Sequence, residues 1–114
     1  MSAVNFQLDN FTLFLDNNQM QSDGMSEDVM NTAGKYTGML KALGFQVIEI
    51  DGNDVGQVYD AFMKPHEEGK PKAIVGNTVK GKGVSFMEYN NDWHHNRLTD
   101  TQLAAALSEL EVIP

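Results

Sequence analysis

Three short apolar segments, separated by stretches with helical spacing, constrain the fold of this chain more than any other feature. Residues 11–16, 45–50 and 72–78 are rich in apolar, β-branched and aromatic side chains and predict strands. Residues 32–43 and 55–64 carry apolar side chains at intervals of three and four, which predicts helices. Strands that alternate with helices pair in parallel through right-handed crossovers, so the pattern indicates an α/β fold.

Capping residues mark where the helices begin and end. Gly44 is a natural C-terminal stop for the first predicted helix, and Asp54 can cap the second. Thr99 or Asp100 would cap a last helix, which contains Leu103, Leu107 and Leu110. Because three strands make a thin sheet, we expect residues 1–114 to form a partial three-layer parallel sheet, half of a doubly wound domain.

Composition excludes several classes of protein. The chain has 114 residues, enough for one small domain, and no stretch apolar enough to span a membrane. Its net charge of −8 disfavours nucleic acid as a partner, since nucleic acid binding normally needs a basic face. The chain lacks cysteine, and its first residues show no secretory signal, so we expect a cytoplasmic protein.

The first predicted strand ends in a polar group, Asp16-Asn17-Asn18. Side chains that follow a buried parallel strand lie at the edge of the sheet where α/β proteins bind ligands. The Asn18 side chain offers a carbonyl oxygen, and the residues after it offer backbone carbonyls, which are ligands that Mg²⁺ or Ca²⁺ prefers. The pattern alone is more typical of a polar turn without a ligand.

Several motifs, in this order, resemble the thiamine diphosphate-binding domain of transketolases. They are DNN at residues 16–18, VIEIDGND at 47–54, VKGKGVSFMEYNNDWHH at 79–95 and TDTQLAAALSEL at 99–110. The similarity covers nearly the whole chain and is strongest to split transketolases, in which the cofactor-binding domain is a separate polypeptide. It implies the C-terminal half of a pyrophosphate-binding domain.

The resemblance also implies roles for individual residues. Asn18 and the Met20 backbone carbonyl would bind Mg²⁺ (or Ca²⁺) that bridges the phosphates of thiamine diphosphate. Lys82 and His94 would bind the cofactor, and His94 would also be catalytic, because an imidazole can donate to phosphate or handle a substrate proton near pH 7. The sequence departs from the family at Gln19 and His95, where the family has glycine.

A larger departure concerns the metal. The family's aspartate ligand lies in a Gly-Asp-Gly motif, and this sequence contains no such motif. The resemblance therefore implies partners: complementary transketolase polypeptides that carry the Gly-Asp-Gly half and the pyrimidine-binding domain. The cofactor would bind only in that assembled site, the chain alone would be inactive, and the reaction would transfer a two-carbon ketol unit between sugar phosphates.

Two other functions fit the same residues. The chain could be a catalytically silent half-domain that self-associates through its exposed sheet edge. It could also be a fragment of a thiamine enzyme similar to deoxyxylulose phosphate synthase, which shares the VKGKG loop. Outside the family pattern, the His94-His95 pair is equally typical of a surface, and the lysine-glycine loop of a solvated turn.

Overall fold

The structure is a computed structural model that describes residues 1–21, 24–29 and 34–111. Its elements in chain order are α1 (Ser2–Asn5), β1 (Thr12–Asn17), β2 (Met20–Gln21), β3 (Gly24–Met25), α2 (Ser26–Val29), α3 (Tyr36–Leu43), β4 (Gln46–Asp51), α4 (Val55–Met63), β5 (Lys72–Asn77), the 3₁₀ helix η1 (Asn91–His94) and α5 (Asp100–Glu111). The three predicted strands are present as β1, β4 and β5, each within one residue of its expected bounds. The short elements α1, β2, β3, α2 and η1 were not predicted.

The three long strands form one parallel sheet in the order β1-β5-β4. This confirms the α/β fold class and the parallel sheet. The last of these strands in the chain is the central one, and Ala73 and Val75 in its middle are buried. Because the strands run in the same direction, their carboxyl ends meet at one edge, where Asn77 lies between Asn17 and Asp51.

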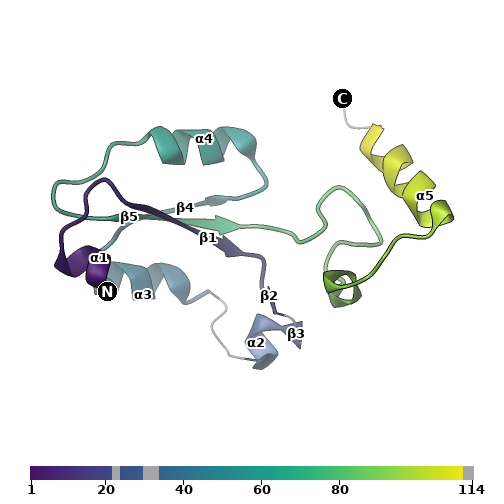
Figure 1. The fold of residues 1–114 in the computed structure, drawn as a ribbon, viewed down its shortest axis with the longest axis horizontal. Coiled ribbons are helices and arrows are strands. Elements are labelled where there is room, and N and C mark those ends of the chain that lie inside the picture. The colour runs from purple at the N-terminus through teal and green to yellow at the C-terminus, as the bar shows by residue number, and fades with distance from the viewer. Residues whose placement is uncertain (22–23, 30–33, 112–114) are drawn as a thin grey trace.

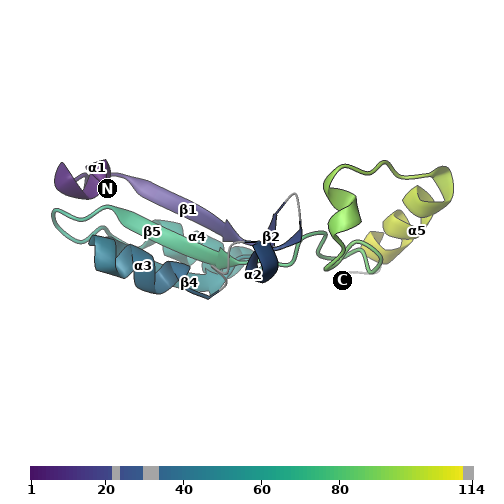
Figure 2. The same cartoon turned by 90° about the horizontal axis from the view of Figure 1, so that it is seen from below.

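Helices cover both faces of this sheet (Figure 1). α4 lies on one face, and α1 and α3 lie on the other, as Figure 2 also shows. On the α3 face, Leu40 packs against Ala73 and Val75. Half-buried apolar side chains surround this cluster: Leu13, Leu15, Phe45 and Val47. On the α4 face, the rings of Phe14 and Phe62 are stacked, with centroids 6.0 Å apart.

The predicted caps are confirmed at three helix ends. Gly44 ends α3 in a left-handed conformation, with φ of 101°. The Asp54 carboxylate accepts hydrogen bonds from two backbone N–H groups in the first turn of α4, at 2.8 and 3.1 Å. Thr99 rather than Asp100 caps α5, because its hydroxyl oxygen accepts from the Gln102 N–H at 3.3 Å.

One helix is shorter than predicted. α3 begins at Tyr36, whereas the apolar spacing predicted a helix over residues 32–43. Gly34 has φ of 70°, a left-handed conformation that an α-helix does not contain, so the helix starts only after it. Residues 32 and 33 lie outside the described part of the chain.

The segment that follows β5 extends beyond the carboxyl edge of the sheet (Figure 1). The hydroxyl and backbone N–H of Ser85 both donate to the Glu109 carboxylate, which fixes α5 to this segment. The α5 leucines are 45–48% exposed, whereas Ala106 is buried. In the part of the chain that the structure describes, no helix is both long and apolar enough to cross a membrane.

A buried lysine joins α4 to the central strand. Lys72, the first residue of β5, is only 1% exposed. Its ammonium donates to the backbone carbonyls of Ala61, Phe62 and Lys64 at 3.2, 2.9 and 2.7 Å. These carbonyls lie at the C-terminal end of α4, where the helix dipole favours a cation and where carbonyls lack partners within the helix.

Replacing this lysine tests how much its hydrogen bonds contribute to the free energy of unfolding. We expect Lys72→Met to lower the free energy of unfolding by about 2–3 kcal/mol, because it leaves buried carbonyls without a donor. Urea denaturation followed by circular dichroism measures the change. Lys70→Met is the matched control, since the Lys70 ammonium forms an exposed ion pair with Glu67, worth less than about 1 kcal/mol. Equal losses in the two variants would show that the buried contacts contribute little.

Candidate functional site

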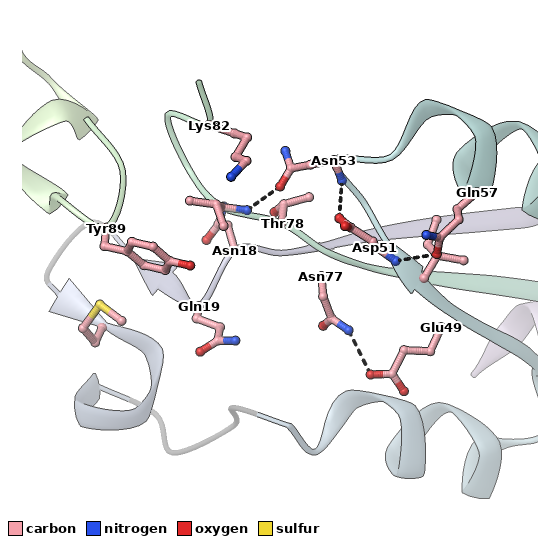
Figure 3. Close-up of a pocket in the computed structure, with 13 residues that line it drawn as sticks. Asn18, Gln19, Glu49, Asp51, Asn53, Gln57, Asn77, Thr78, Lys82 and Tyr89 are labelled. Carbon is pink, nitrogen blue, oxygen red and sulfur yellow. Dashed lines mark hydrogen bonds between the residues drawn. The ribbon is translucent and has the colours of Figure 1, made fainter. Parts of the chain in front are cut away.

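A cavity of about 550 Å³ lies at the carboxyl ends of the three parallel strands (Figure 3). Asn18 reaches it from the end of β1, Asp51 from β4 and Asn77 from β5. Lys82 and Tyr89 close it from the segment after β5. The parallel topology therefore brings together polar residues that are up to about seventy positions apart in the sequence.

The Asn18 side chain is held in one orientation. Its Oδ1 accepts a hydrogen bond from the Met20 N–H at 2.9 Å, and its Nδ2 donates to the Asp16 carboxylate at 3.3 Å. Thr78, just after β5, donates its hydroxyl proton to the other oxygen of Asp16. A carbonyl oxygen has two lone pairs, so the contact with Met20 leaves Oδ1 with capacity for a second partner.

Met20, two positions after Asn18, lies in the β2–β3 pair. Met20 is opposite Met25, and the flanking hydrogen bond from the Ser26 N–H to the Gln19 carbonyl is 2.8 Å long. In an antiparallel ladder this makes Met20 and Met25 a non-hydrogen-bonded pair, so their pairing does not use the Met20 carbonyl. Asn18 and Met20, the two predicted metal ligands, are thus separated by one residue just after the end of β1.

Gln19, between these two residues, has φ of 59°. This left-handed conformation disfavours residues with a Cβ and suits glycine. The departure from the family at this position therefore carries a conformational cost.

A hydrogen-bond network that the sequence did not reveal crosses the edge of the sheet. The Asn17 amide donates to Asn77 at 2.7 Å, and the Asn77 amide donates to Glu49 at 3.0 Å. The Thr37 hydroxyl donates to the same Glu49 carboxylate at 2.7 Å. The hydrogen bond from Asn77, followed by that from Thr37, lowers the pKa of Glu49. The only sequence signal is that Asn17 directly follows one predicted strand and Asn77 is the last but one residue of another.

The turn after β4 is fixed against the end of β5. The Asn53 side chain accepts from the Val79 N–H at 2.7 Å (Figure 3). Gly52 allows this approach, because a Cβ at this residue would lie 2.5 Å from the Thr78 side chain and 3.1 Å from the Gly76 backbone. The predicted turn at Asp51-Gly52 is confirmed, and its asparagine is a further residue of the cavity wall.

Lys82 lies in the loop that faces Asn18. It lines the first cavity and a second one of about 660 Å³, and Asn18 and Asn53 line both. Its ammonium lies 3.5 Å from the Glu88 carboxylate, which also accepts from the Gly83 N–H at 3.0 Å. The hydrogen bond from the Gly83 N–H is the main cause that lowers the pKa of Glu88, and the charge of Lys82 lowers it further. This ion pair is at the surface and leaves the lysine about half exposed.

His94 is not among the residues that line the two cavities, but it contacts one residue that lines the second. It lies at the end of η1, and its Nδ1 is 2.7 Å from the ammonium of Lys80, which lines the second cavity. The charge of Lys80 is the main cause that lowers the pKa of His94, and partial desolvation and His95 contribute. The structure thus brings Asn18 and Lys82 together at the edge of the sheet and connects His94 to them through Lys80, whereas Met20 is not among the residues that line either cavity.

Comparisons with known proteins give one consistent result. The family described as the thiamine diphosphate-binding domain of transketolase matches residues 1–113. An apulose-4-phosphate transketolase subunit from Actinobacillus succinogenes is 33% identical over 97% of this chain, and the 6-deoxy-6-sulfo-D-fructose transketolase subunit SqwG of a Clostridium species is 36% identical over 97%. The chain spans about 40% of the length of each.

A solved structure agrees with these relatives. The crystal structure of transketolase from Campylobacter jejuni superposes with a TM-score of 0.85 at 25% identity, over 96% of this chain and 17% of that one. This chain therefore corresponds to a small part of the much longer chain of that enzyme.

The backbone strain at Gln19 leads to a testable prediction. We expect Gln19→Gly to raise the free energy of unfolding by up to about 1 kcal/mol, because glycine removes the left-handed penalty but costs some unfolded-state entropy. Urea denaturation measures the change. Gln21→Gly, in β2 and without positive φ, is the control and should destabilise the chain. A loss of stability in both variants would contradict the prediction.

The pKa of Glu49 leads to a second prediction. Because its folded pKa is below its unfolded value, ionised Glu49 stabilises the fold above the unfolded pKa, and this contribution is lost as pH falls through the folded pKa. We expect Glu49→Gln to cost less than about 1 kcal/mol at pH 7, since solvent screens the group. The cost should shrink as the pH of urea denaturation is lowered towards about 3. Glu68→Gln is the control of equal charge, and a cost independent of pH would disprove the assignment.

Proposed function

This chain belongs to the family of transketolase thiamine diphosphate-binding domains, and we propose that it forms part of a split transketolase. In this proposal it helps to bind Mg²⁺ and thiamine diphosphate for transfer of a two-carbon ketol unit between sugar phosphates. The relatives named as transketolase subunits support the split arrangement. The relatives described above are transketolases, which favours this reaction over that of a deoxyxylulose phosphate synthase.

The observation that carries the proposal is the pair of oxygens at the end of β1. The Asn18 Oδ1 belongs to a residue that lines the cavity at the carboxyl edge of the sheet, and the Met20 carbonyl belongs to the residue two positions further along the chain. Both are hard oxygen donors of the kind that Mg²⁺ or Ca²⁺ binds. Across the cavity, Lys82 provides a positive charge suited to a phosphate group.

The donor set fits only part of a magnesium diphosphate site. Asn18 and Met20 contribute neutral oxygens, and the nearest carboxylate, Asp16, already accepts hydrogen bonds from Asn18 and Thr78. Mg²⁺ sites in proteins usually include one or two carboxylates. In the proposal, the missing carboxylate comes from the Gly-Asp-Gly half on another polypeptide, so the chain alone is inactive.

The open edge of β1 supports such a partner. β1 pairs only with β5 in the described part of the chain, so its outer edge presents unpaired backbone groups. Phe11 and Phe14 beside this edge are 40% and 37% exposed. A strand from a complementary polypeptide would satisfy the backbone and cover these rings. We also propose that the assembly is cytoplasmic.

When bound, thiamine diphosphate supplies the carbon nucleophile that carries the two-carbon unit, while the protein positions it. Asn18 and Met20 would hold the metal, and Lys82 and His94 would contact the phosphates. His94 would also face the reacting sugar, which makes it the proposed catalytic residue of this chain. The sugar substrates that appear in the relatives' names belong to those proteins and are not assigned to this chain.

The second candidate function, a catalytically silent half-domain, rests on the same open edge. Two copies could pair their β1 edges about a two-fold axis and cover the same phenylalanines. This arrangement needs no cofactor, and the incomplete set of metal ligands is compatible with it.

Calorimetry separates the two candidates. We expect thiamine diphosphate with Mg²⁺ to bind only when the chain is mixed with polypeptides that carry the Gly-Asp-Gly half and the pyrimidine-binding domain. Asn18→Ala should weaken this binding at least tenfold, because it removes a metal ligand. Asn10→Ala, in the turn before β1, is the control and should bind normally.

A stable homodimer that binds no cofactor in any mixture would establish the silent half-domain instead. Sedimentation of the chain alone and of each mixture supplies this measurement.

A further inference from the structure

Two basic side chains meet beside the second cavity. The Nζ of Lys80 lies 2.7 Å from the Nδ1 of His94, although the residues are fourteen positions apart. Lys80 lines the cavity together with Lys82, in a chain that carries only eight lysines and arginines. Two full positive charges at hydrogen-bond distance would repel each other, so the contact restricts where the protons lie.

The local fold holds this contact in place. Gly81, next to Lys80, has φ of 77°, and a Cβ there would lie 2.7 Å from the Met87 side chain. The segment around Met87 is itself fixed to η1, since the Trp93 indole donates to the Phe86 carbonyl at 3.0 Å. The rings of Phe86 and Trp93 also lie 5.3 Å apart. Lys80 and His94 are therefore brought together by backbone and packing.

Only one arrangement of protons is favourable at neutral pH. A donor is needed between the two nitrogens, and either the ammonium or the imidazole could supply it. At pH 7 a lysine side chain in general keeps its proton, whereas an imidazole is in general mostly neutral. Lys80 therefore donates, and the Nδ1 of His94 accepts with its lone pair. The proton of the neutral ring is then on Nε2.

We propose that Lys80 is a positioning residue that holds His94 as the neutral imidazole with its proton on Nε2. His94 then acts towards its ligand as a hydrogen-bond donor and not as a general base, because its one lone pair is already used by Lys80. The statement about the ligand rests on the proposed function, whereas the statement about the proton concerns this chain alone.

Lys80 and His95 both act on the pKa of His94 in the direction that this assignment requires. Lys80 approaches from the loop after β5, and His95 meets the ring edge to face, with centroids 4.4 Å apart. Asp92 is the acidic residue of the same turn. The net effect lowers the pKa of His94, with Lys80 as the largest cause. His94 thus becomes charged only at a pH below the usual range for histidine.

Nuclear magnetic resonance of the ¹⁵N-labelled chain tests the proposal without any cofactor. Imidazole nitrogen shifts distinguish the two neutral tautomers and the charged ring, and only three histidines need assignment. At pH 7 we expect His94 to show a protonated Nε2 and an acceptor Nδ1. In Lys80→Met its pKa should rise towards the ordinary histidine value, and the second tautomer should become populated. Lys64→Met, a lysine on another part of the surface, should change neither.

Two results would overturn the proposal. One is a protonated Nδ1 on His94 in the wild-type chain at pH 7, which needs no variant to observe. The other is an unchanged His94 titration in a folded Lys80→Met. Because thiamine diphosphate is not in the sample, failure of this inference and failure of cofactor binding are separate outcomes.

Discussion

The buried ammonium of Lys72 is the contact on which the small sheet most depends. A three-stranded sheet with few covering helices buries few side chains, so each attachment of a helix matters. Lys72 is the first residue of the central strand, and it attaches α4 to the sheet. Its ammonium donates to three carbonyls at the C-terminal end of that helix. The position of α4 in turn places Phe62 against Phe14 and sets one wall of the core.

The opposite end of the sheet is organised by neutral amides. Asn17 and Asn77 lie side by side in the register, and the network continues to Glu49 on β4 and Thr37 on α3. These contacts fix the ends of three strands relative to one another. The residues that would touch a ligand lie just beyond them, so the network acts as the rigid base of the candidate site.

The two sides of the candidate site offer different chemical groups. On the β1 side it offers neutral oxygens from Asn18 and Met20, and on the loop side it offers Lys80, Lys82 and an imidazole whose pKa is lowered. Such a surface suits an anionic ligand, but it lacks an unengaged carboxylate for the metal within the described residues. The incomplete ligand set and the open edge of β1 both fit the proposal that another chain completes the site.

The sequence by itself determined the strands, the main helices, three helix caps and the family, because these depend on local spacing and on motifs that are contiguous. Through the family resemblance it also predicted Asn18 and Met20, shortly after β1, as metal ligands. The order β1-β5-β4, the Asn17–Asn77–Glu49 network and the buried role of Lys72 were decided only by the tertiary structure. The contact of Lys80 with His94 belongs to the same group. Each joins residues that are distant in the chain, and only packing of the strands and loops brings such residues within hydrogen-bond distance.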